Sequence, residues 1–409
     1  MRVLEINAIY GTQSTGTIVK NIQSTCFNNN IECYVAYSEC YLPSSQVRDG
    51  YKIGNIFDYK LHALFTRIAG KMGYYSHIPT YFFLRYLDKI KPDIVHLHNL
   101  HGNFINLPML LKYVAKKDIA TVITMHDCWY FTGGCTHYSS SNCNRWQQSC
   151  CSCPRRYEEV PAYLYDGSAK ILSDRVSLLS AIPRLTMIGC SKWISEECKK
   201  SKIRCSNVSY IHNGFNTDIF KPLNGKDEIV AFKKKYDIPL DNKIILCPAS
   251  KWYESRNSTT FSYFVDNLPD NITMVVFGCS VPGGGGSPKV KELGYFKTPS
   301  DMAALYSCGD VMVNCSREDT LSSLNIECQA CGTPVVAYDN TGTSETVHPN
   351  IGRLVETGNA EMLLKETLDT LSSNLMHNKD VLVEWATTNF EKQANFNKYI
   401  ELFRTIYNK

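Results

Sequence analysis

The chain has 409 residues, which is too long for one ordinary hydrophobic core and predicts two domains. Its hydrophobic content of 44% and charged content of 20% are typical of a well-packed globular protein. The net charge of +4 is too small for the dense basic surface of a nucleic-acid-binding protein, but it suits a phosphorylated small ligand or weak contact with an anionic membrane.

The N-terminal half alternates short apolar runs with longer amphipathic stretches. It begins with a predicted strand at 2–7, a turn at 11–16 and a helix from residue 17. Further strands, with a helix at about 104–117, are expected at 31–37, 93–99, 121–127 and 184–191. Continuous apolar strands that alternate with helices indicate a parallel sheet covered on both faces.

The second half repeats this pattern after a run at 208–214 that leads into a connector. Its predicted strands lie at 243–250, 272–279, 290–296, 310–316 and 333–339. Helices are expected at about 320–331 and 381–407, and the Gly run 283–286 is expected to be a flexible loop. Two successive Rossmann-like halves predict an α/β protein whose ligands bind beyond the carboxyl ends of the strands, in a cleft between the sheets.

The sequence indicates a cytoplasmic protein. No apolar run reaches the ~20 residues that span a bilayer, and a Glu, an Asn and a Gly interrupt the first apolar run, which makes a poor signal peptide. The 18 cysteines are therefore expected to be reduced thiols, buried or metal-bound, rather than disulfides.

The most informative stretch is SREDTLSSLNIECQACGTPVVAYDNTGTSETV, residues 316–347. It resembles the retaining GT-B glycosyltransferases of family 4 (group 1), which carry two acids eight residues apart, an EAMACGTPVV-type helix and strand, and a Gly-rich loop ending in Glu. Asp319 and Glu327 have this spacing, and Glu318 is the alternative first acid. The resemblance implies that a carboxylate on the helix, Glu327, accepts hydrogen bonds from a nucleotide ribose and that Asp319 lies near the donor sugar.

The same resemblance implies a diphosphate site. Backbone N–H groups at a helix N-terminus attract anions, and here they belong to Thr320, Leu321 and Ser322, while Gly342 permits close approach of the backbone. The stretch PASKWYESRN, residues 248–257, is similar to a family loop in which a basic residue faces the diphosphate. Arg256 takes that position and Lys251 is a further candidate contact. Asn257 replaces the usual Gly.

On the N-terminal half, the resemblance implies that Gly16 and Thr17 contact the donor and that His126, at a strand end, contacts the donor sugar. Asp127 is expected either to orient His126 or to face the acceptor. His98 and His101, in HLHNLHGN, also end a strand, and they are read either as acceptor-side groups or as strand-end packing.

The resemblance implies the GT-B fold, with an acceptor-side domain at 1–190, a donor domain at 191–388 and a C-terminal helix at 389–409 that packs back toward the first domain. It implies transfer of a sugar, with retained configuration, from a nucleotide diphosphate sugar to a glycan or undecaprenyl-linked acceptor in surface polysaccharide biosynthesis. The family's mechanism is front-face attack without an obligatory enzyme nucleophile, so His126, Arg256 and Asp319 are the candidate catalytic residues.

No organic cofactor is expected, and no DxD-type metal site is present in the expected loop, so a catalytic divalent ion is not required. Residues 59–77 mix basic and aromatic side chains and predict either peripheral contact with the inner face of the plasma membrane or an ordinary amphipathic helix. Two other functions stay open: a nucleotide-sugar epimerase of related fold, which needs no acceptor, and a zinc-binding nucleic-acid module.

The stretch 126–154 is rich in cysteine and similar to an insertion in a subset of bacterial family members. Its pattern C-x7-C-x6-C-x2-C predicts a structural zinc site with four thiolate ligands, namely Cys135, Cys143, Cys150 and Cys153. Alternatives are that His137 replaces one thiolate, that reduced thiols simply pack the loop, or that a disulfide forms if the protein is oxidised.

Overall fold

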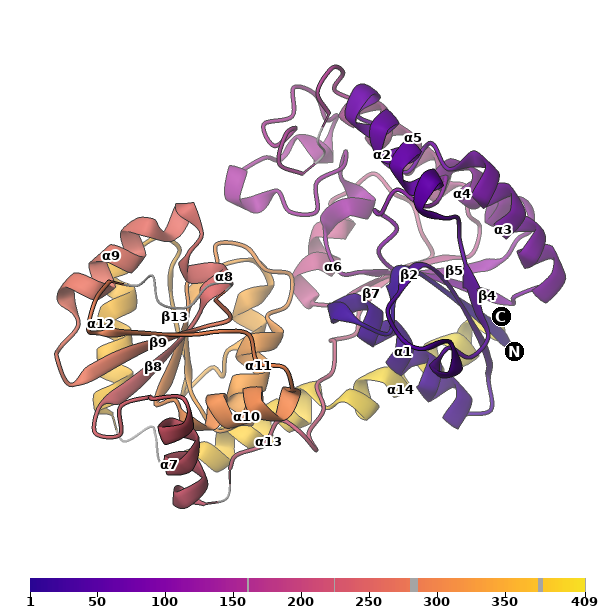
Figure 1. The fold of residues 1–409 in the computed structure, drawn as a ribbon. Coiled ribbons are helices and arrows are strands. Elements are labelled where there is room, and N and C mark those ends of the chain that lie inside the picture. The colour runs from indigo at the N-terminus through magenta and orange to yellow at the C-terminus, as the bar shows by residue number, and fades with distance from the viewer. Residues whose placement is uncertain (160–161, 224, 280–285, 374–377, 409) are drawn as a thin grey trace. The chain divides into compact units, whose positions relative to one another are not determined.

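The computed structural model describes residues 1–159, 162–223, 225–279, 286–373 and 378–408, and the chain forms two compact units (Figure 1). Unit 1 comprises Met1–His212 and Asn395–Lys409, and unit 2 comprises Asn213–Ala394. The first sheet extends past residue 190, where the sequence analysis ends the first domain, because β7 (Asn207–Tyr210) pairs in parallel with β6 (Leu185–Gly189).

Unit 1 is built on a seven-stranded sheet in the order β3-β2-β1-β4-β5-β6-β7, and neighbouring strands pair in parallel. The other five strands are β1 (Arg2–Tyr10), β2 (Glu32–Cys40), β3 (Gly50–Lys52), β4 (Ile94–Leu97) and β5 (Ala120–Met125). The strand order reverses between β1 and β4. In open parallel sheets, ligands bind beside such a reversal, beyond the carboxyl ends of the strands.

The helices of unit 1 cover both faces of this sheet (Figure 1). They are α1 (Gln13–Asn28), α2 (Ile56–Ala69), α3 (His77–Ile90), α4 (Leu107–Lys116), α5 (Ser168–Ser180), α6 (Lys192–Lys199) and most of α14 (Lys392–Tyr407). Ile22 of α1 and Phe403 of α14 belong to one buried cluster with strand residues such as Val3. The predicted return of the C-terminal helix to the first domain is therefore confirmed.

The single helix predicted at 381–407 is wrong, because the structure has two. α13 (Lys379–Phe390) ends before Glu391, which is extended and forms a parallel bridge with Phe215. The Glu391 carboxylate then accepts hydrogen bonds from the backbone N–H groups of Gln393 and Ala394, at 2.7 and 2.6 Å. A carboxylate that caps the first turn starts a new helix at this point.

Unit 2 is built on a six-stranded parallel sheet in the order β10-β9-β8-β11-β12-β13, which reverses between β8 and β11. Its strands are β8 (Lys243–Pro248), β9 (Ile272–Phe277), β10 (Val290–Leu293), β11 (Val311–Asn314), β12 (Val335–Asp339) and β13 (Arg353–Glu356). Both this sheet and that of unit 1 follow the doubly wound α/β pattern that the alternation of strands and helices predicts.

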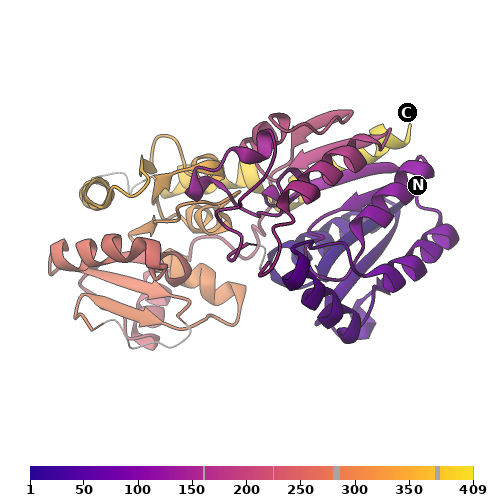
Figure 2. The same cartoon turned by 90° about the horizontal axis from the view of Figure 1, so that it is seen from above.

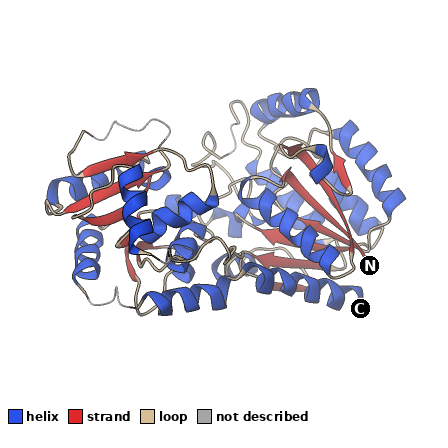
Figure 3. Cartoon of the chain, turned by 60° about the horizontal axis from the view of Figure 1, so that its bottom comes forward, coloured by secondary structure: helices blue, strands red, loops and turns tan. Residues whose placement is uncertain are grey.

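Helices lie on both faces of the unit 2 sheet (Figure 2 and Figure 3). One buried cluster joins the strands to α8 (Ala249–Trp252), α9 (Ser258–Asn267) and α12 (Ala360–Ser372). The other joins them to α7 (Lys226–Lys235), α10 (Pro299–Cys308) and α11 (Ser323–Ala330). Because both faces are covered, the inner strands β9, β8, β11 and β12 are mostly apolar, whereas the edge strands β10 (VKEL) and β13 (RLVE) carry charged residues.

Several element boundaries differ from the sequence prediction. The turn predicted at 11–16 ends earlier, since α1 already begins at Gln13, and the short strands β3 and β13 were not predicted. Three glycines of the predicted flexible run, 283–285, lie outside the described residues. In the part of the chain that is described, no helix is long and apolar enough to cross a membrane.

Candidate active site

The acidic loop of unit 2 lies between β11 and α11. Because α11 begins only at Ser323, residues 320–322 belong to this loop and not to the helix predicted from residue 320. The Glu318 side chain is only 5% exposed, and its Oε1 lies 3.4 Å from Nη1 of Arg256. Asp319 is partly exposed, and its Oδ1 accepts a hydrogen bond from the Leu321 N–H at 3.3 Å. The buried acid is therefore neutralised by Arg256, while the next acid stays accessible.

A second loop, after β12, holds the acidic loop in place. The Thr341 hydroxyl accepts from the Asp319 N–H at 2.9 Å and lies 2.5 Å from the Asp319 carbonyl oxygen. The Gly342 N–H donates to the same carbonyl at 2.9 Å, and the Asn340 amide donates to the Ser316 carbonyl at 2.6 Å. Loops joined by several hydrogen bonds present their side chains in one fixed geometry, which a binding site requires.

The Arg256 loop, after β8, is fixed to the same strand end. Asn257 is fully buried, and its amide donates to the carbonyl oxygens of Lys251 and Cys315, both at 2.9 Å. Its φ of −108° needs no glycine, which explains how Asn can stand where the family loop usually has Gly. Arg256 is 41% exposed and also pairs with Glu254 at 3.2 Å. Lys251 is half-buried in α8.

Glu327 lies on α11, as predicted, and protein atoms surround most of its carboxyl group although part of the residue is exposed. Burial raises the pKa of Glu327 to about 8, and the nearby Tyr306 hydroxyl opposes this shift. Tyr306 itself is fully buried. A carboxyl group with this pKa is mostly protonated at neutral pH, so a ligand that requires the carboxylate will compete with a proton.

The N-terminus of α11 faces the same loop. Thr320, Leu321 and Ser322 are all buried, and the Ser322 hydroxyl accepts a hydrogen bond from the Asn314 amide at 3.1 Å. Among the described residues, Ser322 makes no side-chain capping bond to its own helix. The first N–H groups of a helix can bind an anion, since they lack carbonyl partners within the helix.

The predicted donor-side residues thus come from loops that follow three adjacent strands of the sheet. Lys251 and Arg256 follow β8, Glu318 and Asp319 follow β11, and Gly342 follows β12. β8 and β11 are the two strands between which the order of the sheet reverses. This is the position at which a doubly wound sheet binds a nucleotide.

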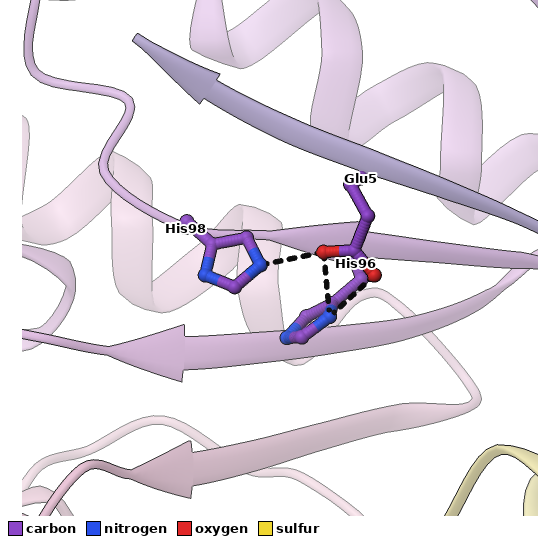
Figure 4. Close-up of side chains that lie close together, drawn as sticks. All are labelled: Glu5, His96 and His98. Carbon is purple, nitrogen blue, oxygen red and sulfur yellow. Dashed lines mark hydrogen bonds and ion pairs between the residues drawn. The ribbon is translucent and has the colours of Figure 1, made fainter. Parts of the chain in front are cut away.

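In unit 1, His126 follows β5 and belongs to a buried chain of polar side chains. Its ring stacks on that of His98, with centroids 5.3 Å apart, and its Nε2 lies 3.0 Å from Nδ1 of His98. His98 Nε2 in turn lies 2.6 Å from the Glu5 carboxylate (Figure 4). Glu5, on β1, and His98, after β4, flank the reversal in strand order.

The ionisation states of Glu5, His98 and His126 determine which ring nitrogens in this hydrogen-bonded network carry protons. Although burial opposes it, the contacts with His96 and His98 lower the pKa of Glu5 to about 2, so this acid is ionised and can only accept hydrogen bonds. Burial, together with the neighbouring His96, lowers the pKa of His98 to about 4, and burial lowers that of His126 strongly. Neutral His98 therefore donates from Nε2 to Glu5 and accepts at Nδ1 from His126 Nε2–H. His126 consequently has Nδ1 as its acceptor atom.

Glu5 also contacts His96, whose Nδ1 lies 3.0 Å from Oε2 (Figure 4). His96 Nε2 lies 2.8 Å from the Thr124 hydroxyl, which is 3.0 Å from the Tyr399 hydroxyl of α14. Glu5, His96 and His98 place potential metal-ligand atoms within 4.8 Å of one another. The distances are those of hydrogen bonds, however, and an N–H donor opposite each carboxylate contact explains them without a metal ion.

Asp127, which was expected either to orient His126 or to face the acceptor, pairs with His101. Asp127 Oδ2 lies 2.8 Å from His101 Nε2, and Oδ1 accepts from the Trp129 N–H at 2.9 Å. Burial raises the pKa of Asp127, but the His101 contact outweighs it and the net shift is downward. Asp127 therefore starts the short 3-10 helix Cys128–Phe131 and holds His101.

Gly16 and Thr17 lie within α1 and not in the preceding turn. Gly16 is buried, and a Cβ there would lie 2.9 Å from the Ile9 carbonyl oxygen, so only glycine lets α1 approach the end of β1 this closely. Gly11 N–H also donates to the Gly16 carbonyl at 2.9 Å. Thr17 is exposed. Close packing accounts for Gly16, whatever its role in ligand binding.

Glu5, His96 and Tyr306 also belong to these networks and were not predicted from the sequence. A charged residue in the middle of an otherwise apolar strand, as in RVLEINAIY, was a usable signal, because a buried carboxylate requires partners. The second signal was His96, a histidine on the fully buried strand β4, with His98 directly after that strand. Nothing in the sequence around Tyr306 marks it as a neighbour of Glu327.

Comparison with known proteins agrees with this arrangement. Residues 275–373 match the family model of the glycosyl transferases group 1, and residues 46–219 match that of Glycosyltransferase Family 4. WcaC of Escherichia coli (strain K12), named as a colanic acid biosynthesis glycosyl transferase, is 21% identical over 280 residues. That alignment spans 64% of this chain and 64% of the relative's length.

Solved structures share the fold over nearly the whole chain. A glycosyltransferase from Rickettsia africae ESF-5 has a TM-score of 0.69 at 16% identity, with 99% of this chain and 98% of that chain covered. Alr3699/HepE of Anabaena, solved with UDP, has a TM-score of 0.67 at 14% identity, with 99% and 100% covered. At these identities the likeness shows the fold alone.

Two Rossmann-like units in one chain form the GT-B fold, which these solved structures share. Models of two glycosyltransferase families match residues in both units, so the chain is a glycosyltransferase.

Proposed function

We propose that this enzyme transfers a sugar, with retention of configuration, from a nucleotide diphosphate sugar to a glycan or lipid-linked glycan acceptor in surface polysaccharide biosynthesis. One observation supports donor binding in unit 2 most directly: the loops after β8, β11 and β12 bring Arg256, Glu318 and Asp319 to one edge of the sheet, at its reversal in strand order. Basic and acidic groups held there suit a ligand that combines a diphosphate with sugar hydroxyls.

In this proposal Arg256 and the N-terminus of α11 stabilise the leaving diphosphate. Arg256 is exposed enough to reach a ligand, and its charge is already oriented by Glu318. A guanidinium suits phosphate oxygens, and fixed donors that face developing negative charge lower the barrier without rearrangement. Lys251 adds a second cation on the same loop. Glu327 accepts hydrogen bonds from the ribose, and Asp319 contacts the donor sugar.

His126 contributes from unit 1 as a contact to the donor sugar. Its Nδ1 can accept a hydrogen bond from a hydroxyl group, because the chain through His98 to Glu5 places its proton on Nε2. No organic cofactor is part of this proposal. Uridine nucleotides are the first donors to test, since Alr3699/HepE was solved with UDP and with UDP-glucose.

The acceptor and its location are proposed from two observations. WcaC is named for the biosynthesis of colanic acid, which supports a polysaccharide acceptor.

In addition, α2 exposes a row of apolar side chains, with Phe57 79% exposed, beside the exposed bases Lys60 and Arg67. Exposed apolar side chains mixed with bases suit the surface of an anionic membrane. We therefore place the enzyme at the inner face of the plasma membrane, where an undecaprenyl-linked acceptor is anchored.

A panel of nucleotide sugars tests the donor assignment. A ligand that binds only the folded chain must raise the melting temperature, so one nucleotide sugar should do so in the wild type and fail to do so in Arg256→Ala. Incubation of that donor without acceptor should release no sugar isomer. Release of an epimer would identify an epimerase instead, and no shift with any nucleotide sugar would contradict the proposed function.

A further inference from the structure

Five cysteines surround one small cavity in the irregular segment between β5 and α5. The cavity has a volume of about 20 Å³, enough for about one water-sized occupant. The cysteines that line it are Cys135, Cys143, Cys150, Cys151 and Cys153. All five lie outside helices and strands, whereas Cys247 and Cys315 are fully buried in unit 2 in the manner of small apolar core residues. Core packing therefore does not explain the five cysteines around the cavity.

The segment around them has little regular structure to hold it. Between β5 and α5, the described residues form only three short 3-10 helices, Cys128–Phe131, Ser139–Ser141 and Arg145–Gln147. Trp146 is buried between Phe131 and Tyr138, which provides a small apolar centre. Irregular connections of this length are uncommon in compact domains unless they are functional or tied together. A cross-link among the cysteines would supply the missing constraint.

Hydrogen bonds to and from the backbone hold the C-x-x-C turn in position. The Arg145 guanidinium donates to the carbonyl oxygens of Cys151 and Ser152, at 2.7 and 2.5 Å, and so fixes the C-x-x-C turn. The Cys153 sulfur accepts a hydrogen bond from the Arg155 N–H, and the Cys150 sulfur accepts one from Gly133.

Gly133 is required for the close approach of the backbone to the Cys150 sulfur. A Cβ at this position would lie 2.8 Å from the Cys150 sulfur and 2.7 Å from the Ser168 carbonyl oxygen, so any other residue would displace the thiol. The neighbouring Gly134 has a φ of +135°, which side chains rarely tolerate. The Gly pair before Cys135 thus brings the backbone against the C-x-x-C turn.

We propose that Cys135, Cys143, Cys150 and Cys153 bind a structural zinc ion through four thiolates. The Cys135 and Cys153 sulfurs are already within hydrogen-bonding distance of each other, and Cys143 and Cys150 line the same cavity. Thiolate sets of this kind select zinc among the common divalent ions, and four protein ligands leave no position open for catalysis. The ion would tie the segment together independently of the donor assignment in unit 2.

The sulfurs must move inward to bind the ion. Among the described residues, the set of three or more potential metal ligands within 4.8 Å of one another is Glu5, His96 and His98, so the cysteines are more widely spaced. The close pair Cys135 and Cys153 could alternatively form a disulfide. The two chemistries differ in the number of thiols consumed and in the metal content, and both quantities can be measured on the full-length chain.

The test is metal analysis of the full-length chain, purified under reducing conditions, with a matched cysteine variant. About one zinc per chain is expected in the wild type and in Cys151→Ser, which removes an exposed thiol from the same cavity. Cys143→Ser and Cys150→Ser should lose most of the zinc. Cobalt exchanged into the wild type should give the thiolate-to-metal absorption of a tetrahedral four-sulfur site, which keeps the test decisive if the variants do not fold.

Three results would overturn the proposal. The first is a folded, reduced wild type without zinc that also fails to bind added cobalt. The second is a Cys135–Cys153 disulfide, detected by mass spectrometry after alkylation, in the protein as it is made in cells. The third is an equal loss of zinc in Cys151→Ser and in Cys143→Ser, since this would deny the ligand set assigned here.

Discussion

Arg256 lies 3.4 Å from Glu318, 62 residues further along the chain, and this ion pair joins the loops after β8 and β11. The two partners differ in exposure: the Glu318 side chain is 5% exposed and that of Arg256 is 41% exposed. A buried carboxylate needs a partner, while the accessible side of a guanidinium retains donors for a second anion. The pair therefore holds a cation in place at the edge of the sheet where we propose that the diphosphate binds.

Arg256→Ala should reduce kcat/KM of sugar transfer by about 100-fold, in line with the loss of one preorganised donor that stabilises developing negative charge. Steady-state kinetics with the donor identified by thermal shift would measure this. Arg353→Ala is the matched control, since Arg353 is also in unit 2, is 37% exposed and pairs with Glu366. Equal activity in both variants would contradict the role of Arg256.

Nucleotide binding should depend on pH through Glu327. Burial raises the pKa of this group to about 8, and only the carboxylate can accept two ribose hydrogen bonds with both of its oxygens. Nucleotide affinity should therefore increase as pH rises from 6 to 8, by up to about tenfold per pH unit, and become constant above that. Calorimetric titration at several pH values would show it.

The stability of the ligand-free chain should change in the opposite direction. Because the folded pKa of Glu327 is raised, the folded state keeps a proton that the unfolded state has lost, so the contribution of Glu327 to the free energy of unfolding falls as pH rises from about 4.5 to 8. In Glu327→Gln the contribution of Glu327 to both pH dependences should be lost, whereas Glu366→Gln should keep it. An unchanged profile in Glu327→Gln would mean that another group titrates.

Glu5→Gln should destabilise unit 1 by about 3 kcal/mol, since it removes the charged partner of two buried histidines. Glu32→Gln on the adjacent strand β2 is the control; its side chain is 60% exposed, and its loss should change stability by about 0.5 kcal/mol or less. Denaturant unfolding would measure both. Similar values for the two variants would show that the buried network contributes little.

The same network gives a second pH profile. The pKa of His98 is lowered to about 4 in the folded protein. As pH decreases from 6.5 to 4, His98 therefore binds a proton in the unfolded state before it does so in the folded state, and its contribution to stability should fall. The lowered pKa of Glu5 continues this loss below pH 4.5. His98→Gln should flatten the upper part of the profile and lower kcat, with nucleotide affinity unchanged. A loss of affinity instead would deny that His98 acts through His126.

The fold could be predicted because strands that are buried on both faces appear in the sequence as continuous apolar runs, such as 243–250 and 272–279. The break at Glu391 could not, because it depends on a contact with Phe215, far away in the sequence. At the candidate site, Arg256 and Glu327 could be proposed because the short motifs around them resemble those of a known family. The Glu5–His98–His126 chain could not, since it joins three strands whose neighbours are known only from the sheet order.

Membrane contact through α2 gives the last prediction. Phe57 and Leu61 are 79% and 54% exposed on α2, next to the bases Lys60 and Arg67. Phe57→Asp combined with Leu61→Asp should weaken co-sedimentation with vesicles of anionic lipid, because it removes buried apolar area and adds repulsion. Tyr295→Asp is the control, as Tyr295 is 73% exposed but lies in unit 2. Activity on a short water-soluble acceptor should remain, while activity on a vesicle-anchored acceptor falls. If the wild type itself does not bind such vesicles, the exposed face of α2 serves some other contact.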